Sequence, residues 1–158
     1  MAPKNTKKTM PMSKKEMLGS YRTMKTIREF EWRMFKEFEA GNIPGVIHSY
    51  DGKEAIATGV CNNLLVTDFI GSTHRGHGHC IAKGCDVGDM VKEIMARSTG
   101  LCKGKGGSMH IADVSKGMLG ANAIVGGAPP LCVGAALTAK SKKTGGVSVS
   151  FSGDGASN

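Results

Sequence analysis

The clearest apolar pattern in the chain lies near its start. Apolar residues recur there at helical spacing: Met17, Tyr21, Met24, Ile27, Met34 and Phe38. Ser13 and Glu16 form a capping box ahead of this stripe, in which the serine hydroxyl accepts an amide of the first turn and the glutamate reaches back to the cap. We therefore expect a helix that ends at Ala40-Gly41 and packs its apolar face into the core.

Shorter patterns along the rest of the chain alternate between helix and strand. Capping residues and inward-facing aliphatics predict helices at 51–62 and 86–100, and a proline in the first turn predicts a helix at 130–142. Apolar runs at 66–70 and 147–151 predict buried strands. This alternation favours an α/β fold with a parallel sheet flanked by helices.

Glycine is the residue type that departs most from an average composition. The chain has 23 glycines, and most of them lie between Gly71 and Gly155. The glycine-rich segments 71–79 and 153–155 each follow a predicted strand. Because ligands of parallel sheets bind outside the carboxyl ends of the strands, we expect both segments to share one edge of the sheet and to form a binding surface.

Asp154 stands between two glycines in the second of these segments. A carboxylate in such a turn suits Mg²⁺, which prefers hard oxygen ligands, and the exposed amides of the turn suit phosphate. Gly-Asp-Gly is also common in plain turns, so the motif alone leaves both interpretations open. The P-loop and dinucleotide-binding patterns of glycines are absent.

The segment 74–85 is rich in side chains that can bind metals or anions: His74, Arg75, His77, His79, Cys80 and Cys85. Histidine and cysteine are zinc ligands, whereas histidine beside arginine suits an anion such as phosphate. Spacing alone leaves three hypotheses open, namely an anion site, a zinc site and structural histidines.

Charge and cysteine content exclude several classes of protein. The net charge of +8 comes mainly from residues 1–40, with ten Lys/Arg against five Asp/Glu, and residues 1–12 are expected to form a disordered basic tail. No basic stripe alternates with aromatic residues, so we expect no nucleic-acid partner. The chain has neither a signal peptide nor an 18-residue apolar run, and its five cysteines lack a Cys-x-x-Cys pair. These features favour a cytoplasmic protein with reduced thiols and no membrane partner.

Five motifs follow one another along the chain: HSYDGKEA at 48–55, STHRGHG at 72–78, KGKGGSMH at 103–110, NAIVG at 122–126 and GDGASN at 153–158. The ordered series closely resembles the alpha subunit of the thiamine-diphosphate-dependent dehydrogenases that feed lipoyl-bearing acyltransferases. The resemblance runs from about residue 15 to the last residue. Segments 72–84 and 100–120 look most like the acetoin branch, and the pyruvate branch, which usually has Tyr at the position of His74, is the alternative.

The resemblance implies thiamine diphosphate and Mg²⁺ as cofactors. Asp154 would bind the metal, and the amides of Gly155 and Ala156 would contact the diphosphate. His74 and Arg75 match the phosphate-binding pair of the family.

The resemblance also implies residues for the reacting end of the cofactor. The backbone of Ala123 to Val125 would hold the aminopyrimidine ring and the bent cofactor, although the family more often has Gly where Ala123 stands. His48 and His77 match histidines near the reacting thiazolium, and we expect them to transfer protons or orient the substrate.

The partners implied are a beta subunit, in an alpha2beta2 enzyme, and a lipoyl-bearing acyltransferase that receives a two-carbon unit from acetoin or pyruvate. Members of the family continue past the position of Asn158 with paired asparagines and a flexible loop. We therefore expect residues 13–158 to be the N-terminal part of a thiamine-diphosphate-binding domain, incomplete in this chain and inactive alone. The rival hypothesis from another class of protein is a non-catalytic His/Cys metal-binding module at 74–85.

Overall fold

The computed structural model describes residues 12–158, so all but one residue of the expected disordered tail lie outside the described part. The elements in chain order are α1 (Lys14–Glu39), α2 (Glu54–Cys61), β1 (Phe69–Gly71), α3 (His77–Lys83), α4 (Val87–Ile94), the 3-10 turn η1 (Val114–Lys116), β2 (Met118–Gly120), α5 (Ala128–Ser141), β3 (Ser148–Ser150) and the 3-10 turn η2 (Asp154–Ser157). No helix of this described part is long and apolar enough to cross a membrane.

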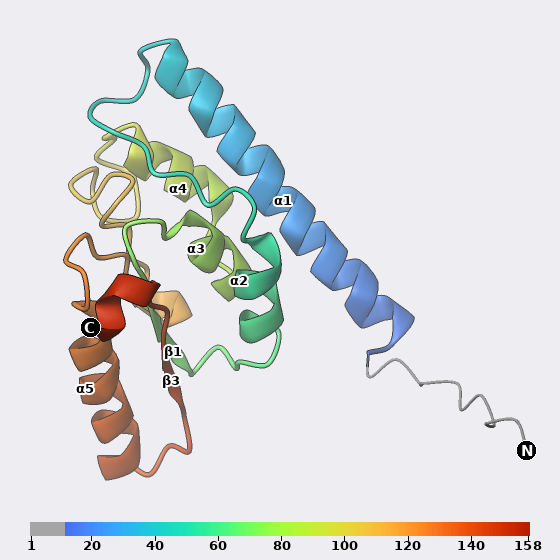
Figure 1. Cartoon of the computed structure of the whole chain (residues 1–158), viewed down its shortest axis with the longest axis vertical. Coiled ribbons are helices and arrows are strands. Elements are labelled where there is room, and N and C mark those ends of the chain that lie inside the picture. Colours follow the sequence, from blue (N-terminus) through green and yellow to red (C-terminus); the bar gives the residue numbers. More distant parts are fainter. Residues whose placement is uncertain (1–11) are drawn as a thin grey trace, which may run out of the picture.

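The three strands form a parallel sheet in the order β2-β1-β3, which confirms the predicted α/β architecture. In Figure 1 the sheet stands between α5 on one side and α2 and α3 on the other, with α1 outermost. The central strand β1 contributes the fully buried Ile70, which belongs to a core built from α1, α3, α4 and the loop before β2. Helices cover both faces of the sheet, as expected for parallel strands, and the central strand β1 is the most buried.

The capping box predicted at the start of α1 is confirmed. The amide of Glu16 donates to Ser13 Oγ at 3.3 Å, and the amide of Ser13 donates to Glu16 Oε2 at 2.7 Å. The expected apolar face is buried only along the middle of the helix, where Ile27 and Met34 enter the core. Tyr21 is exposed, because 3.6 residues per turn place it at the edge of the apolar face, away from Ile27 and Met34.

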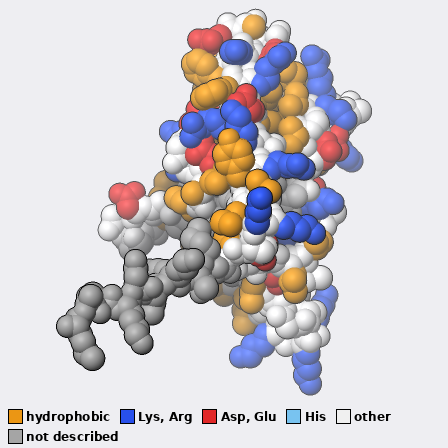
Figure 2. Space-filling model, turned by 90° about the vertical axis from the view of Figure 1, so that its right-hand side faces the viewer, with side chains coloured by type: hydrophobic (Ala, Val, Ile, Leu, Met, Phe, Trp, Pro, Cys, Tyr) orange, Lys and Arg blue, Asp and Glu red, His pale blue; other side chains and the backbone are white. Residues whose placement is uncertain are grey.

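The outer face of α1 carries exposed apolar side chains among basic ones (Figure 2). Leu18, Tyr21, Trp32 and Phe35 are each at least half exposed. The ammonium of Lys25 lies 5.7 Å from the Trp32 ring centre, a cation–π distance. This face is therefore mixed in character and has no continuous basic stripe.

Several element boundaries differ from the predicted ones. The second helix begins at Glu54 rather than at Asp51, because the Asp51 carboxylate faces the Arg28 guanidinium at 3.6 Å and caps no amide. The strand predicted at 66–70 begins only at Phe69, since residues 65–68 form a turn. The fourth helix is capped by the side chain of Asp86, as predicted.

The fourth helix nevertheless ends at Ile94, before the predicted Thr99-Gly100, because the chain turns back towards the carboxylate of Glu93. This fully buried carboxylate accepts four backbone amides of the following loop, from Cys102, Gly104, Gly106 and Gly107, at 2.7–3.2 Å. Burial raises the pKa of Glu93, but the four amides outweigh it and hold the pKa below its usual value. One charged side chain thus orders a glycine-rich loop that has no hydrophobic period.

The close packing of α3 on the segment before α2 gives a stability prediction. A Cβ at Gly78 would overlap the ring of the buried Tyr50, whereas a Cβ at Gly59, on the exposed face of α2, would meet no atom within 4 Å. Gly78→Ala should lower the free energy of unfolding by roughly 1–3 kcal/mol through overpacking. Gly59→Ala, the matched control, should raise it by roughly 0.4–1 kcal/mol, because alanine restricts the unfolded chain.

Urea denaturation followed by circular dichroism measures both free energies. Equal effects of the two alanines would contradict the described contact between α3 and the Tyr50 ring.

Candidate active site

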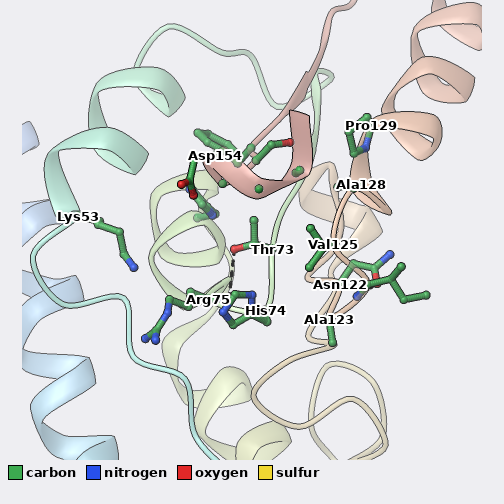
Figure 3. Close-up of a pocket in the computed structure, with 18 of the residues that line it drawn as sticks. Lys53, Thr73, His74, Arg75, Asn122, Ala123, Val125, Ala128, Pro129 and Asp154 are labelled. Carbon is green, nitrogen blue, oxygen red and sulfur yellow. Dashed lines mark hydrogen bonds between the residues drawn. The ribbon is translucent and has the colours of Figure 1, made fainter. Parts of the chain in front are cut away.

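One cavity of about 480 Å³ opens beyond the carboxyl ends of β1 and β3 (Figure 3). All seven residues predicted to bind the cofactor line it: His74, Arg75, Ala123, Val125, Asp154, Gly155 and Ala156. The expectation that the two glycine-rich segments share one edge of the sheet is confirmed.

The parallel pairing of β1 with β3 produces this arrangement. Phe69 is in register with Ser148, and the Phe151 amide extends the pairing by donating to the Gly71 carbonyl at 2.9 Å. The segment that carries His74 therefore leaves the sheet beside the segment that carries Asp154. Helix α5 packs closely against β1, since a Cβ at Gly71 would lie 2.7 Å from Cys132 Sγ of α5.

The wall of the cavity contributed by α2 and the segment after β1 is basic. Lys53, His74 and Arg75 line it, and the Arg75 guanidinium is held by the Ser49 carbonyl at 2.8 Å. Burial lowers the pKa of His74, and His48, Arg75 and Lys53 lower it further. Burial and then Arg75 also lower the pKa of Lys53. Mutual repulsion of this kind is relieved when an anion binds between the groups.

The segment after β3 offers a carboxylate and an open amide. Asp154 is exposed at the start of η2. Within residues 12–158 the amide of Gly155 meets no hydrogen-bond acceptor, whereas that of Ala156 donates to the Gly153 carbonyl at 3.1 Å. The Gly155 amide is thus free for a ligand. A contact from the Ala156 amide to phosphate stays a prediction, because this amide already stabilises the turn.

An apolar wall faces these polar groups. Figure 3 shows Val125 and Asn122 across the cavity from Lys53. The Asn122 side chain accepts the Ile124 amide at 2.9 Å, which fixes the turn, and the side chains of Ile124 and Val125 are largely exposed. The backbone of Ala123 lies outside the left-handed region, so alanine is accommodated where the family more often has glycine.

Residues 22–158 match the family of the dehydrogenase E1 component. The chain belongs to this family. It is 57% identical over 149 residues to the subunit alpha of acetoin:2,6-dichlorophenolindophenol oxidoreductase from Bacillus subtilis, and 55% identical over 149 residues to that of Cupriavidus necator. It is 38% identical over 146 residues to the pyruvate dehydrogenase E1 component subunit alpha from Zymomonas mobilis.

These alignments cover 92–94% of the chain but only 41–45% of each relative. The chain thus spans a little under half the length of the relatives that it matches. The matches confirm the resemblance inferred from the ordered motifs.

His48 and His77 stand behind the cavity of this E1 chain rather than among its lining residues. The His48 ring lies edge-on to the His74 ring, with 5.2 Å between the ring centres, and its buried Nδ1 has no partner within the described residues. His77 is fully buried and hydrogen-bonds to Glu31 and Ser108. Their roles in proton transfer or substrate orientation stay predictions.

His79 lines the cavity. The spacing of the histidines in the sequence could not distinguish this position from a zinc ligand or a packed core residue. Its ring stacks on Phe151 at 3.8 Å and hydrogen-bonds to the hydroxyls of Tyr50 and Ser72 at 3.0 and 2.6 Å. Burial lowers the pKa of His79 to about 3, so its ring is neutral at physiological pH. The sequence signal that could have found it is its helical register: His79 stands two residues after His77, so α3 turns the two rings to different sides.

The zinc hypothesis for 74–85 finds no support in this geometry. The ring nitrogens of His77 and His79 face carboxylate and hydroxyl oxygens of the protein. Over residues 12–158 no three His, Cys, Asp or Glu side chains are grouped as metal ligands. A hydrogen bond with Cys85 and burial together raise the pKa of the Cys80 thiol, which marks it as an inert core residue.

From the basic groups in this wall we predict that His74 takes up a proton when an anion binds in the cavity. His74 has a lowered pKa in the free protein and is largely neutral at pH 7. A bound diphosphate raises this pKa, so binding between about pH 6 and 7 should be accompanied by proton uptake. Titration calorimetry with inorganic diphosphate, repeated in buffers of different ionisation enthalpy, measures the number of protons.

His74→Asn should abolish most of this uptake while leaving a measurable affinity through Arg75 and Lys53. The comparison of the two proteins cancels the protons that the diphosphate itself releases. The same proton count for the unaltered protein and the variant would contradict protonation of His74 on binding.

Proposed function

We propose that this chain is part of the alpha subunit of a thiamine-diphosphate-dependent dehydrogenase that cleaves acetoin and passes the two-carbon unit to lipoamide. The observation that carries the proposal is the single cavity in which His74 and Arg75 face Asp154 and Gly155 across the ends of two parallel strands. Relatives named for acetoin oxidation are 55–57% identical, against 38% for a pyruvate dehydrogenase relative, which favours acetoin over pyruvate.

The residues present fit a cofactor with a charged end and a flat apolar end. Arg75 and His74 suit the diphosphate oxygens, and the free Gly155 amide suits one more. Asp154 supplies a carboxylate for a Mg²⁺ ion that the diphosphate would share. The exposed Val125 side chain offers an apolar support for the rings.

When bound, thiamine diphosphate would supply a nucleophilic ring carbon and a cationic ring that can take up the electron pair of a cleaved carbon–carbon bond. The chain contributes position and charge. Arg75 would hold the diphosphate end directly and Asp154 would hold it through Mg²⁺, while the turn at 122–126 would shape the path of the cofactor. We propose that His48, which lies against His74, orients the substrate or moves a proton at its ring nitrogen.

The proposal includes a beta subunit, in an alpha2beta2 enzyme, and a lipoyl-bearing acyltransferase as partners. Support comes from the relatives, each of which is named as a subunit alpha. Helix α5 also exposes Leu131, Val133 and Leu137, and such an apolar surface suits a contact with another protein segment or subunit. We place the enzyme in the cytoplasm, in line with five cysteines that are all free thiols.

Replacing Arg75 tests the proposal. In the full-length alpha subunit combined with its beta subunit, Arg75→Met should weaken thiamine diphosphate binding roughly tenfold to a hundredfold, the effect of one charge-assisted hydrogen bond. Asp154→Asn should remove most of the Mg²⁺ dependence of binding. Titration calorimetry with and without Mg²⁺ measures both effects, and acetoin-dependent dye reduction measures the matching loss of turnover.

Arg97→Met is the matched control, because Arg97 is exposed in a turn outside the cavity. It should bind cofactor like the unaltered enzyme. An Arg75→Met enzyme with unaltered affinity, or an unaltered enzyme with higher kcat/KM for pyruvate than for acetoin, would count against the assignment.

A further inference from the structure

A chain of three hydrogen bonds runs through the buried layer behind the cavity. Glu31 of α1 and His77 of α3 are fully buried, and Ser108 is nearly so. His77 Nδ1 lies 3.0 and 3.1 Å from the two Glu31 carboxylate oxygens, and His77 Nε2 lies 2.9 Å from Ser108 Oγ. Ser108 Oγ in turn accepts the backbone amide of His48 at 3.1 Å.

These bonds have one consistent direction. A carboxylate only accepts, so His77 Nδ1 carries a proton and donates it to Glu31. When the ring carries only this proton, Nε2 is an acceptor and the Ser108 hydroxyl donates to it. The same hydroxyl oxygen accepts the His48 amide. Every donor therefore points towards the Glu31 charge, and each bond of such a chain polarises the next.

The neighbours of the chain keep its members in place. The Phe30 ring stands edge-on to the His77 ring, with 5.7 Å between the ring centres. Ser108 directly follows the loop that Glu93 orders through four amides. The last member, His48, carries its ring to the edge of His74 in the cavity wall.

We propose that Glu31 is a positioning residue that fixes the Nδ1–H tautomer of His77 and, through Ser108, the place of the His48 backbone beside the cofactor cavity. The proposal rests on the proposed function, in which His48 faces the substrate. Glu31 itself touches no residue of the cavity lining in this chain of bonds. Its hydrogen bonds reach the cavity only through His77 and Ser108, while its charge also raises the pKa of Lys53 in the cavity wall.

Glu31→Gln is the sharpest test, because it keeps the size of the side chain. Both carboxylate oxygens lie near Nδ1, so the glutamine must bring its amide nitrogen within reach of the ring. That nitrogen donates a hydrogen bond, so it favours the tautomer of His77 in which Nδ1 accepts and Nε2 carries the proton. An amide in place of a carboxylate beside a histidine is known to select the wrong tautomer in this way. Ser108 Oγ can still accept, so the protein stays folded while the two hydrogen bonds of the His77 ring reverse; the His48 amide, which can only donate, keeps its bond to Ser108 Oγ.

We expect kcat for acetoin to fall roughly tenfold to a hundredfold, the usual range for loss of a group that orients a functional histidine. The affinity for thiamine diphosphate should change less than about threefold, since no group of the cavity lining is altered, a difference worth under 1 kcal/mol. The enzyme used is the full-length alpha subunit with its beta subunit. Solid-state NMR of the ¹⁵N-histidine-labelled complex, with the His77 signals assigned by their loss in His77→Gln, reads the tautomer directly.

Ser108→Ala provides a second variant. It removes the link between His77 and His48, so it should lower kcat to a similar extent while His77 keeps the Nδ1–H tautomer. Glu29→Gln, on the same helix but exposed, is the control and should leave both kcat and the His77 signals unaltered.

An Nε2–H tautomer or a doubly protonated His77 ring in the unaltered enzyme would overturn the proposal, and so would a Glu31→Gln enzyme with unaltered kcat. Failure of the proposed function has a different signature, namely an unaltered complex that binds no thiamine diphosphate and does not oxidise acetoin. The NMR result then still decides whether Glu31 sets the tautomer of His77.

Discussion

The parallel pairing of β1 with β3 is the constraint on which the site depends. Only three residues of each strand pair, yet their register brings the segments after both strands to one edge. Side chains about eighty positions apart in the sequence, Arg75 and Asp154, thereby line a single cavity. Without this pairing, the basic and the carboxylate-bearing segments would be separate loops, and neither would line the cavity alone.

Two buried carboxylates stabilise the parts of the molecule that hydrophobic packing leaves unsupported. Glu93 collects the amides of a glycine-rich loop, and Glu31 accepts from His77 in the layer behind the cavity. A buried charge of this kind is tolerated only when hydrogen bonds satisfy it. Both carboxylates therefore connect α1 and α4 to the loops that carry Ser108 and His48, and the fold and the site depend on each other through them.

Local signals in the sequence predicted much of the fold. The capping box at Ser13, the aspartate cap at Asp86 and the proline near the start of α5 each act within one helical turn, and each was confirmed. The strand β2 was missed, because three residues ending in glycine carry no period. The exposure of Tyr21 was missed as well, since an apolar stripe does not show how much of its width the neighbouring elements cover.

The candidate site was predicted through the order of its motifs rather than through any one of them. The residues predicted to bind the cofactor, from His74 to Ala156, line one cavity. The neighbours of His77 and His79 depend on long-range contacts with Glu31, Ser108 and Tyr50 that spacing cannot reveal.

A crystal structure of the full-length alpha and beta subunits with thiamine diphosphate and Mn²⁺ in place of Mg²⁺ tests the central claim most directly. The account predicts the diphosphate between Arg75 and the Gly155 amide, with an anomalous peak of the metal at Asp154. An ordered cofactor bound elsewhere, with the edge beyond β1 and β3 open to solvent, would contradict it.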